Sequence, residues 1–445
     1  MCVRVGFGDM DESPKLGLFS GIGLVASSMI GVGVLVSAGW AASVLGPGEI
    51  LLAWLVGGAI ALCGARAYAE LATLVPRSGG EYRYLADLLH PALGALAGWA
   101  SLFLGFAAPV AFCAAMADAY MATLVELPTH ALGASIIVGI TLVGARSARA
   151  TQRVQDALAL AKVVLFALFL AIGAVAGSHA WPQWQPEAPH EGFPVASFFG
   201  QLLWVGLAYN GWNTASYVSE EFREPRRDVP RAMLLGTLLV TLLYLAVNWV
   251  FVANLDTGTL SEWRSAGGDG ARTTLAHLIV RELAGPTGAA AMSSFVVLAM
   301  VSSASAFTVA GPRVYAAMAG DGALPDVFAA RSGATPAAST VLQGVVALAL
   351  LLTHSFDLLV ENCGAVLTFT TALAALALVR ARFRAPAGID RSSIGKLPLA
   401  CALFYFAASA YTLWAAASER PARLLWIALL CVVSAVAYAL RRRTR

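Results

Sequence analysis

Two short clusters rich in glycine and polar residues interrupt long apolar stretches of the sequence. The first is Ser27–Gly33 (Ser-Ser-Met-Ile-Gly-Val-Gly) and the second is Ala208–Asn213 (Ala-Tyr-Asn-Gly-Trp-Asn). Glycine and serine are poor helix formers, and backbone that leaves the helix inside a membrane is tolerated only where it lines a cavity or is buried in protein. Close helix packing is the alternative use of such small residues. Paired interruptions in the two halves of a chain point to a binding site for a transported solute.

Unwound backbone at these clusters can hold charged groups without help from side chains. The N-terminus of a half-helix exposes N–H groups at the positive end of the helix dipole, which favours a carboxylate, whereas unpaired carbonyls favour an ammonium group or a metal cation. An α-amino acid carries both charges on one carbon atom. We therefore expect the backbone of the two clusters to bind the constant part of an amino acid, while side chains select its substituent.

Lys162 is the only lysine between Lys15 and Lys396, and it lies inside an apolar stretch at 155–177. A cation near the bilayer centre costs about 2.5–3.5 kcal/mol on insertion scales, so such residues usually face the protein interior and have a partner. Snorkelling to the membrane surface is the alternative, but Arg153 precedes Lys162 by nine residues, about 13–14 Å along a helix. We predict that the Lys162 ammonium contacts carbonyls of the first cluster, where a transporter could otherwise hold sodium.

Other polar residues in the apolar stretches have simpler explanations. Ser302, Ser303 and Ser305 lie in the eighth stretch, where serines either serve a site or bond to carbonyls of their own helix. Asn213, rather than an acidic residue, ends the second cluster, which counts against a pocket for cationic side chains. HExxH, GxSxG and P-loop motifs are missing and the six cysteines lack CxxC spacing. We therefore expect no enzyme activity, no metal site and no cofactor.

The composition places these residues in a polytopic membrane protein. The chain has 445 residues, of which 59% are apolar and only 12% charged, whereas a soluble domain carries about 25% charged residues. Apolar stretches of about 20 residues, the length that spans a bilayer, predict twelve transmembrane helices. They lie roughly at 17–40, 48–73, 92–122, 127–145, 155–177, 196–217, 232–254, 285–317, 338–354, 357–379, 396–417 and 423–440.

The distribution of basic residues predicts the orientation. With the N-terminus inside, only five of the 29 lysines and arginines fall in outer segments: Arg264, Arg272, Arg281, Arg420 and Arg423. Such an asymmetry predicts that both termini are cytoplasmic, in the inner (cytoplasmic) membrane. The net charge of +3 follows from this bias, so nucleic acid binding is not expected.

Four ordered segments resemble the amino acid–polyamine–organocation superfamily of permeases. The pattern Met29–Leu35 resembles the glycine-rich break of that family's first helix, which usually ends in Phe where this chain has Leu35. Glu70–Tyr82 matches the family segment after the second helix. Ala208–Ala232 resembles the sixth helix of the light-chain and cationic branches, and Arg313–Pro325 is similar to the stretch after the eighth. The resemblance covers spans one to ten.

This resemblance implies an all-α membrane protein of the leucine-transporter type. Five helices are repeated upside down, helices 1 and 6 are broken, and two extra helices follow at the C-terminus. The expected organisation is a cytoplasmic tail at 1–16, a first repeat at 17–178, a second repeat at 196–380, the last two helices at 396–440 and a cytoplasmic tail at 441–445.

The resemblance also assigns roles to backbone groups. The N–H groups of Val32 and Gly33 would bind the substrate carboxylate, and the carbonyls of Met29, Leu207 and Asn210 would bind the amine. The whole expected substrate site comprises Met29, Ile30, Gly31, Val32, Gly33, Leu207, Ala208, Tyr209, Asn210, Gly211 and Phe307.

Lys162 matches a lysine of the fifth helix that replaces a sodium ion in sodium-independent relatives. Its contacts there map to Ser27, Ile30 and an eighth-helix serine, Ser302 or Ser303. Two positions depart from the family pattern. Leu207 stands where many relatives have an aromatic gate, so closure over the substrate would be looser or would rely on Phe307. Asn210 replaces a residue that is often small, which would narrow or polarise the pocket.

Together these observations predict a sodium-independent permease for neutral or small α-amino acids, driven by proton symport or by exchange. An exchanger or exporter of cationic amino acids or amines is the alternative within transport, and a non-transporting nutrient sensor or a channel is the alternative from another class. The expected partners are the amino acid and the lipid bilayer. The oligomeric state, including a homo-oligomer, stays open.

Overall fold

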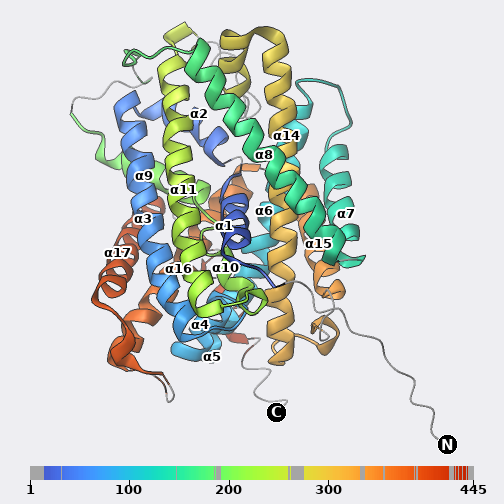
Figure 1. Ribbon diagram of the computed structural model, residues 1–445, viewed down its shortest axis with the longest axis vertical. Coiled ribbons are helices and arrows are strands. Elements are labelled where there is room, and N and C mark those ends of the chain that lie inside the picture. The colour runs from blue at the N-terminus through green and yellow to red at the C-terminus, as the bar shows by residue number, and fades with distance from the viewer. Residues whose placement is uncertain are drawn as a thin grey trace, which may run out of the picture.

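The fold was analysed in a computed structural model of the chain (Figure 1). The structure describes residues 15–31, 33–146, 148–184, 186, 192–258, 261, 275–330, 336–353, 356–384, 386, 389–419, 425, 427–428, 430–432, 434–436 and 438. Helices make up nearly all of the regular structure in these residues, which contain no strand beyond an isolated bridge between Leu16 and Phe222.

Seven helical segments of the described chain are long and apolar enough to cross a membrane. They are α3 (Pro47–Leu74), Pro91–Met121 (α5, η1 and α6), α8 (Ala148–Ala176), α11 (Pro225–Asn254), α14 (Leu275–Gly320), α16 (Phe356–Phe383) and α17 (Lys396–Glu419). Four shorter apolar helices are α1 (Leu18–Met29), α7 (Ala131–Arg146), α9 (Val195–Ala208) and α15 (Ala337–Thr353). The predicted span at 423–440 lies largely outside the described residues.

The third predicted span is a single rod with a wider turn in its middle. It consists of α5 (Pro91–Ala100), the π-helical segment η1 (Ser101–Ala107) and α6 (Ala108–Met121). Pro109 has no N–H and its ring would clash with the preceding turn of an α-helix. The Ala108 N–H donates to the carbonyl of Phe103, five residues earlier. The wider turn therefore accommodates the proline without ending the rod.

The eighth predicted span begins at a sharp bend. α14 is helical on both sides of Gly285, whose φ of 70° and ψ of −175° are not helical. Gly285 precedes Pro286, and a residue before proline is driven out of the helical region. Because glycine alone adopts this backbone conformation readily, the bend lies where the predicted span at 285–317 starts.

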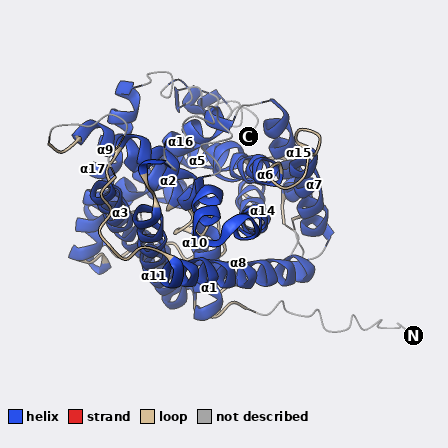
Figure 2. Cartoon of the chain, turned by 90° about the horizontal axis from the view of Figure 1, so that it is seen from above, coloured by secondary structure: helices blue, strands red, loops and turns tan. Residues whose placement is uncertain are grey.

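Two short helices that follow the interruptions lie at the centre of the molecule. Seen from above (Figure 2), α2 (Gly33–Val44) and α10 (Thr214–Tyr217) lie inside a ring that includes α3, α6, α8, α11, α14 and α16. α3 packs against α11, and α6 packs against α14. One end of the bundle carries α4 (Glu81–Leu88), which is drawn near the bottom of Figure 1. The long helices thus enclose the helix ends where the two predicted interruptions lie.

Candidate functional site

The first predicted interruption separates α1 from α2. α1 ends at Met29, and Ile30 has a φ of −66° and a ψ of 86°, which is not helical. The Ile30 N–H still donates to the Ala26 carbonyl at 2.7 Å. Beyond it the chain leaves the helix, so the carbonyls of Ser27 and Ile30 lose the N–H partners that a continuous helix would supply.

The ammonium group of Lys162 binds these two carbonyls. Lys162 Nζ lies 3.0 Å from the Ser27 carbonyl, 2.6 Å from the Ile30 carbonyl and 3.1 Å from Ser303 Oγ. Its side chain is only 1% exposed. A lysine ammonium has three N–H donors, and these three acceptors account for all of them. The buried cation is therefore fully hydrogen-bonded, and it joins α8 and α14 to the end of α1.

Two neighbours of this cluster refine the predicted contacts. Ser303 is the eighth-helix serine that binds Lys162, whereas Ser302 Oγ is buried without a hydrogen-bond partner among the described residues. Gln155 Nε2 donates to Ser27 Oγ at 3.4 Å. Sequence inspection missed Gln155, although it stands seven residues, about two turns, before Lys162 on the same helix.

The second predicted interruption separates α9 from α10. α9 ends at Ala208, and residues 209–213 form turns before α10 begins at Thr214. Gly211 has a φ of 108°, a conformation that strongly favours glycine. Asn210 Oδ1 accepts from the Gly211 N–H at 3.0 Å, and the Thr214 hydroxyl donates to the Gly211 carbonyl at 2.7 Å. Local side chains thus contribute to the stability of this turn.

The two interruptions are in direct contact. A methyl group added at Gly33 would lie 2.6 Å from Ala208 Cα, and one added at Gly211 would lie 2.9 Å from the carbonyl carbon of Ser28. These separations are too short for a real side chain, so glycine is required at both positions for the backbones to approach. The structure therefore brings together the unwound backbone of both clusters.

Tyr244 of α11 bridges the two interruptions. Its hydroxyl lies 2.5 Å from the Met29 carbonyl and 3.1 Å from the Ala208 carbonyl. Tyr244 is completely buried and its ring packs edge-on against Trp54. The sequence analysis did not single it out. The sequence feature that could have pointed to Tyr244 is its place as the lone tyrosine of the seventh apolar stretch, because a buried hydroxyl needs an acceptor.

The other predicted substrate-site residues have different surroundings. The Tyr209 hydroxyl donates to the Trp54 carbonyl at 3.0 Å, so its side chain is directed into α3. Phe307 packs against Phe106 of η1. The added methyl position of Gly31 lies 3.5 Å from Ser303 Oγ, next to the lysine cluster. Val32 lies outside the described residues.

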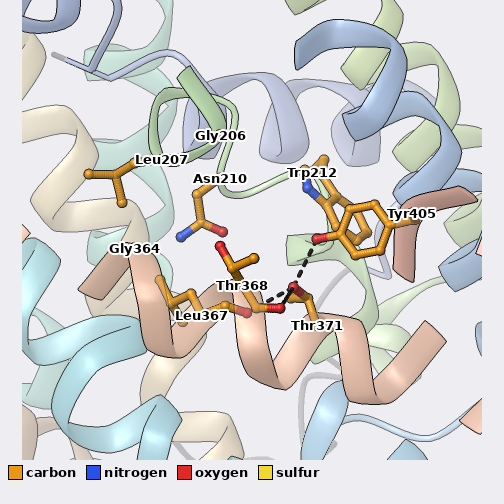
Figure 3. Close-up of a pocket in the computed structure, with 9 residues that line it drawn as sticks. All are labelled: Gly206, Leu207, Asn210, Trp212, Gly364, Leu367, Thr368, Thr371 and Tyr405. Atoms are coloured by element: carbon orange, nitrogen blue, oxygen red, sulfur yellow. Dashed lines mark hydrogen bonds between the residues drawn. The ribbon is translucent and has the colours of Figure 1, made fainter. Parts of the chain in front are cut away.

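Leu207 and Asn210 line a cavity on the other side of the second interruption. The cavity lies between α9, α16 and α17 and has a volume of about 30 Å³ (Figure 3). Its lining comprises Gly206, Leu207, Asn210, Trp212, Gly364, Leu367, Thr368, Thr371 and Tyr405. The last five of these residues come from the tenth and eleventh spans, and no periodic pattern in the sequence indicates that they meet the sixth.

A buried carboxylate lies next to the second interruption. Glu81 of α4 is 3% exposed, and its Oε1 accepts from the Tyr68 hydroxyl at 2.8 Å and from Asn213 Nδ2 at 2.5 Å. Burial raises the pKa of the Glu81 carboxyl above its ordinary value of 4.5. The sequence showed no acidic residue at Asn213 itself. The fold supplies one from a helix that is 132 residues away in the sequence.

Ion pairs and hydrogen bonds connect helices at the α4 end of the molecule. Arg313 of α14 pairs with Glu221, which follows α10. Arg83 of α4 pairs with Asp321, which also accepts from the Tyr82 hydroxyl at 2.8 Å. These contacts close the bundle around the end of α14 on this side.

Comparison with known proteins identifies the family. A model of the amino acid permease family matches residues 16–438. Large neutral amino acids transporter small subunit 2 of Homo sapiens is 29% identical over 265 residues, which cover 56% of this chain and 49% of that protein. b(0,+)-type amino acid transporter 1 is 32% identical over 247 residues in Oryctolagus cuniculus, covering 53% of this chain and 50% of that protein. The same transporter of Homo sapiens is 32% identical over 257 residues, with the same two coverages.

The matched segments set how far this chain can be compared with these relatives. The chain spans about half the length of the curated relatives it matches. Those relatives are transporters, not enzymes, and the family match together with seven apolar helices indicates a multi-pass membrane protein. The chain therefore belongs to the amino acid permease family, within the amino acid–polyamine–organocation superfamily.

Proposed function

We propose that the protein is a sodium-independent secondary transporter of small or neutral α-amino acids. It works by alternating access in the cytoplasmic membrane, by proton symport or by exchange, with both termini on the cytoplasmic side. Membership of the amino acid permease family supports amino acid transport. The substrate class, the ion dependence and the orientation in the membrane are proposals that go beyond the family match.

The observation that carries sodium independence is the ammonium of Lys162 inside the first interruption. Two unwound carbonyls and one serine hydroxyl surround it at 2.6–3.1 Å. Carbonyl and hydroxyl oxygens released from a broken helix are also the ligands by which transporters hold sodium. Because the protein's own cation occupies these oxygens, a second cation at the same place would meet strong repulsion at short range.

The touching backbones support a site for the amino acid head group. α2 begins at Gly33, and its N-terminal end favours the negative charge of a carboxylate. The carbonyls of Met29 and Ala208 each accept from Tyr244, and a carbonyl has a second lone pair for an ammonium group. Both charges of a zwitterion thus have complementary partners within the same pair of interruptions.

Five-plus-five inverted repeats account for the arrangement of these elements. We place the first repeat at 17–178, the second at 196–380 and two further helices at 396–440. The interruptions fall in the first and sixth spans, the second span (α3) packs against the seventh (α11), and the third (α6) packs against the eighth (α14). Pairing of corresponding helices is what a twofold relation between repeats would produce.

Uptake of labelled amino acids into proteoliposomes tests the proposal. Unlabelled neutral amino acids should block uptake, and their methyl esters should block it at least about tenfold less well, because an ester lacks the charged acceptor of a carboxylate. Equal block by acids and esters would contradict capture of the carboxylate. Saturable uptake of none of the twenty amino acids would contradict the function itself.

A second candidate is an exchanger of cationic amino acids or amines. The observation that favours it is the Glu81 carboxylate next to Asn213. Tyr68 and Asn213 already bind that carboxylate, which leaves the neutral substrate as our first choice. Counterflow in vesicles loaded with arginine or with alanine separates the two, since only the true substrate class inside the vesicle accelerates uptake from outside.

A further inference from the structure

We propose that the cavity between α9, α16 and α17 receives the side chain of the transported amino acid and selects small neutral side chains that carry a hydroxyl or carboxamide group. This proposal rests on the amino acid transport proposed above and names the substrate class of that site. Threonine, serine and asparagine are the expected substrates, in preference to valine, alanine and leucine.

The position of the cavity suits this role. Leu207 and Asn210 line it, and both belong to the second interruption, where the backbone would bind the head group. The amino acid side chain branches from the carbon atom that carries both charged groups. A substrate whose amine is bound at the second interruption, by the carbonyls of Leu207 and Asn210, can therefore direct its side chain into this space.

Asn210 presents a hydrogen-bond donor to this space. Its Oδ1 accepts from the Gly211 N–H at 3.0 Å, which fixes the orientation of the amide. Figure 3 shows the amide oxygen on the side of Thr368, and the amide nitrogen, with its two N–H groups, on the side of Leu207 and Gly364, which also line the cavity. The turn that breaks the helix thus also orients a side-chain donor next to the head-group site.

Thr368 presents a hydroxyl from the opposite wall. Its neighbours Thr370 and Thr371 donate to the Leu367 carbonyl at 3.1 and 2.8 Å, the usual way in which a threonine satisfies its hydroxyl in a helix. The Thr368 hydroxyl instead faces the Asn210 amide across the cavity (Figure 3). A hydroxyl donates and accepts, so Thr368 and Asn210 together complement another hydroxyl or a carboxamide.

The hydroxyl groups of Tyr405 and Thr371 are hydrogen-bonded and form a fixed part of the cavity wall. The Tyr405 hydroxyl donates to Thr371 Oγ1 at 2.8 Å, and Thr371 in turn donates to the Leu367 carbonyl. These two hydrogen bonds connect α17 to α16. The single O–H group of Thr371 already donates in the second of them. Selection within the cavity therefore depends on Asn210 and Thr368.

The size of the cavity restricts the substituent. Its volume is about 30 Å³, whereas one water molecule needs at least about 10–15 Å³ on the same scale. Two or three water-sized groups fit, which matches a hydroxymethyl or a small carboxamide and is too little for an indole or phenyl ring. Gly206 is an exposed residue of the cavity lining, and a methyl group added there would meet no atom within 4 Å.

Binding of matched amino acid pairs by the purified full-length protein provides the test. Threonine and valine have the same shape, as asparagine and leucine nearly have, so each pair isolates the polar group. We expect the wild type to bind the polar member roughly threefold to tenfold more tightly, the effect of one net hydrogen bond in a buried site. Equal affinities within both pairs would overturn the proposal.

Thr368→Val removes the hydroxyl while keeping the volume. We expect the threonine-to-valine affinity ratio to fall toward one, with valine binding unchanged or improved. Thr370→Val is the matched control on the same helix, since Thr370 is buried but is not part of the cavity lining. A ratio that Thr368→Val leaves at the wild-type value, or that both variants lower equally, would overturn the assignment.

Gly206→Ala tests the volume and keeps the proposal falsifiable if Thr368→Val does not fold. The added methyl group meets no atom within 4 Å and an alanine favours the helix, so the protein should fold. We expect asparagine affinity to fall at least about threefold, while alanine affinity is retained. Gly139→Ala is the control, because it is also open and exposed but lies on α7, away from the cavity. Unchanged asparagine affinity in Gly206→Ala would count against the cavity.

Different results would contradict the cavity assignment and the transport function. If amino acids bind, but matched pairs bind equally and the variants change nothing, the cavity assignment is wrong and the transport function survives. If no amino acid stabilises or binds the folded wild type, both the function and the cavity assignment are wrong.

Discussion

The two interruptions in the helices are bound by different buried groups, an amine at the first and a carboxyl group at the second. At the first, a buried ammonium from α8 donates to carbonyls that the break releases. At the second, a buried carboxylate from α4 accepts from the amide of Asn213, which ends the break. Neither charge lies on a broken helix itself. Each break is therefore bound by a side chain from a neighbouring helix.

The two charges differ in how completely they are bound. All three donors of the Lys162 ammonium have acceptors. Glu81 Oε1 has two donors, but its Oε2 is buried without a partner among the described residues. A fully bound charge favours one fixed arrangement, whereas a half-bound carboxylate can take a proton or a new donor. The second interruption is thus the one whose surroundings are better suited to change.

Lys162→Ala should produce the largest effect. It removes the ammonium that donates to the Ser27 and Ile30 carbonyls and leaves Ile30 with only the longer contact from Ser303 Oγ at 3.4 Å. A buried acceptor left unpaired costs about 1–3 kcal/mol. We expect proteoliposome uptake to fall at least about tenfold and its pH dependence or its inward-to-outward asymmetry to change. Lys396→Ala removes an exposed lysine at the start of α17 and serves as the control. An unchanged pH profile together with unchanged asymmetry would leave Lys162 with a structural role alone.

Tyr244→Phe should weaken the contact between the two interruptions, and we expect it to have the second largest effect. The variant removes the hydroxyl that lies between the Met29 and Ala208 carbonyls while keeping the packed ring. We expect a loss of about 1–3 kcal/mol in stability, measured by thermal or denaturant unfolding in detergent. Tyr411→Phe, at an exposed tyrosine of α17, is the comparison. Equal unfolding of the two variants would show that the bridge contributes little.

Glu81→Gln should change how stability depends on pH. Burial raises the pKa of the Glu81 carboxyl above 4.5, so the folded protein binds this proton more tightly than the unfolded chain does. Its contribution to stability is then greatest below about pH 4.5 and is lost as the pH rises through the raised pKa, by at most about 1.4 kcal/mol per pH unit.

The glutamine variant keeps the acceptor for Tyr68 but cannot ionise, so this loss should vanish from its unfolding temperature. Glu220→Gln, at an exposed residue, should retain the wild-type pH dependence. Identical pH profiles for wild type and Glu81→Gln would indicate that Glu81 does not titrate across the range of the measurement.

Replacement of sodium by choline should have the smallest effect. Because Lys162 occupies the carbonyls at the first interruption, we expect the initial rate of uptake to change less than about twofold, since no bound ion is lost. A strong requirement for sodium would mean that the cation site lies elsewhere or that the ammonium leaves it during transport.

Local sequence rules predicted where the helices are interrupted. They did not predict all of the residues that contact the interruptions. Glycine at 31, 33 and 211 within apolar stretches indicated where the helix ends, because the backbone preference of glycine is local. The depth of Lys162 in its stretch predicted a buried cation that needs acceptors. The choice of Ser303 over Ser302 depends on the rotation of α14, which a stretch of small residues does not fix.

The remaining parts depend on tertiary packing. Glu81 and Asn213 meet only because α4 folds under α10, and the cavity depends on how α16 and α17 pack against α9. Tyr244 has Thr241 and Asn248 as polar neighbours in its own helix, but these do not reveal that its hydroxyl reaches the carbonyls of two other helices. The predicted substrate role of Phe307 and of the Val32 N–H stays a prediction.

The bridge at Leu16 has a mechanical consequence. The Leu16 N–H donates to the Glu221 carbonyl at 2.8 Å, and the Arg223 N–H donates to the Leu16 carbonyl at 3.0 Å. Phe222 between them packs against Gly21, where a methyl group would lie 2.5 Å from its ring. The start of α1 and the segment after α10 are thus joined by main chain. If the proposed inner side opens, these contacts favour a joint movement of the lower halves of both broken helices.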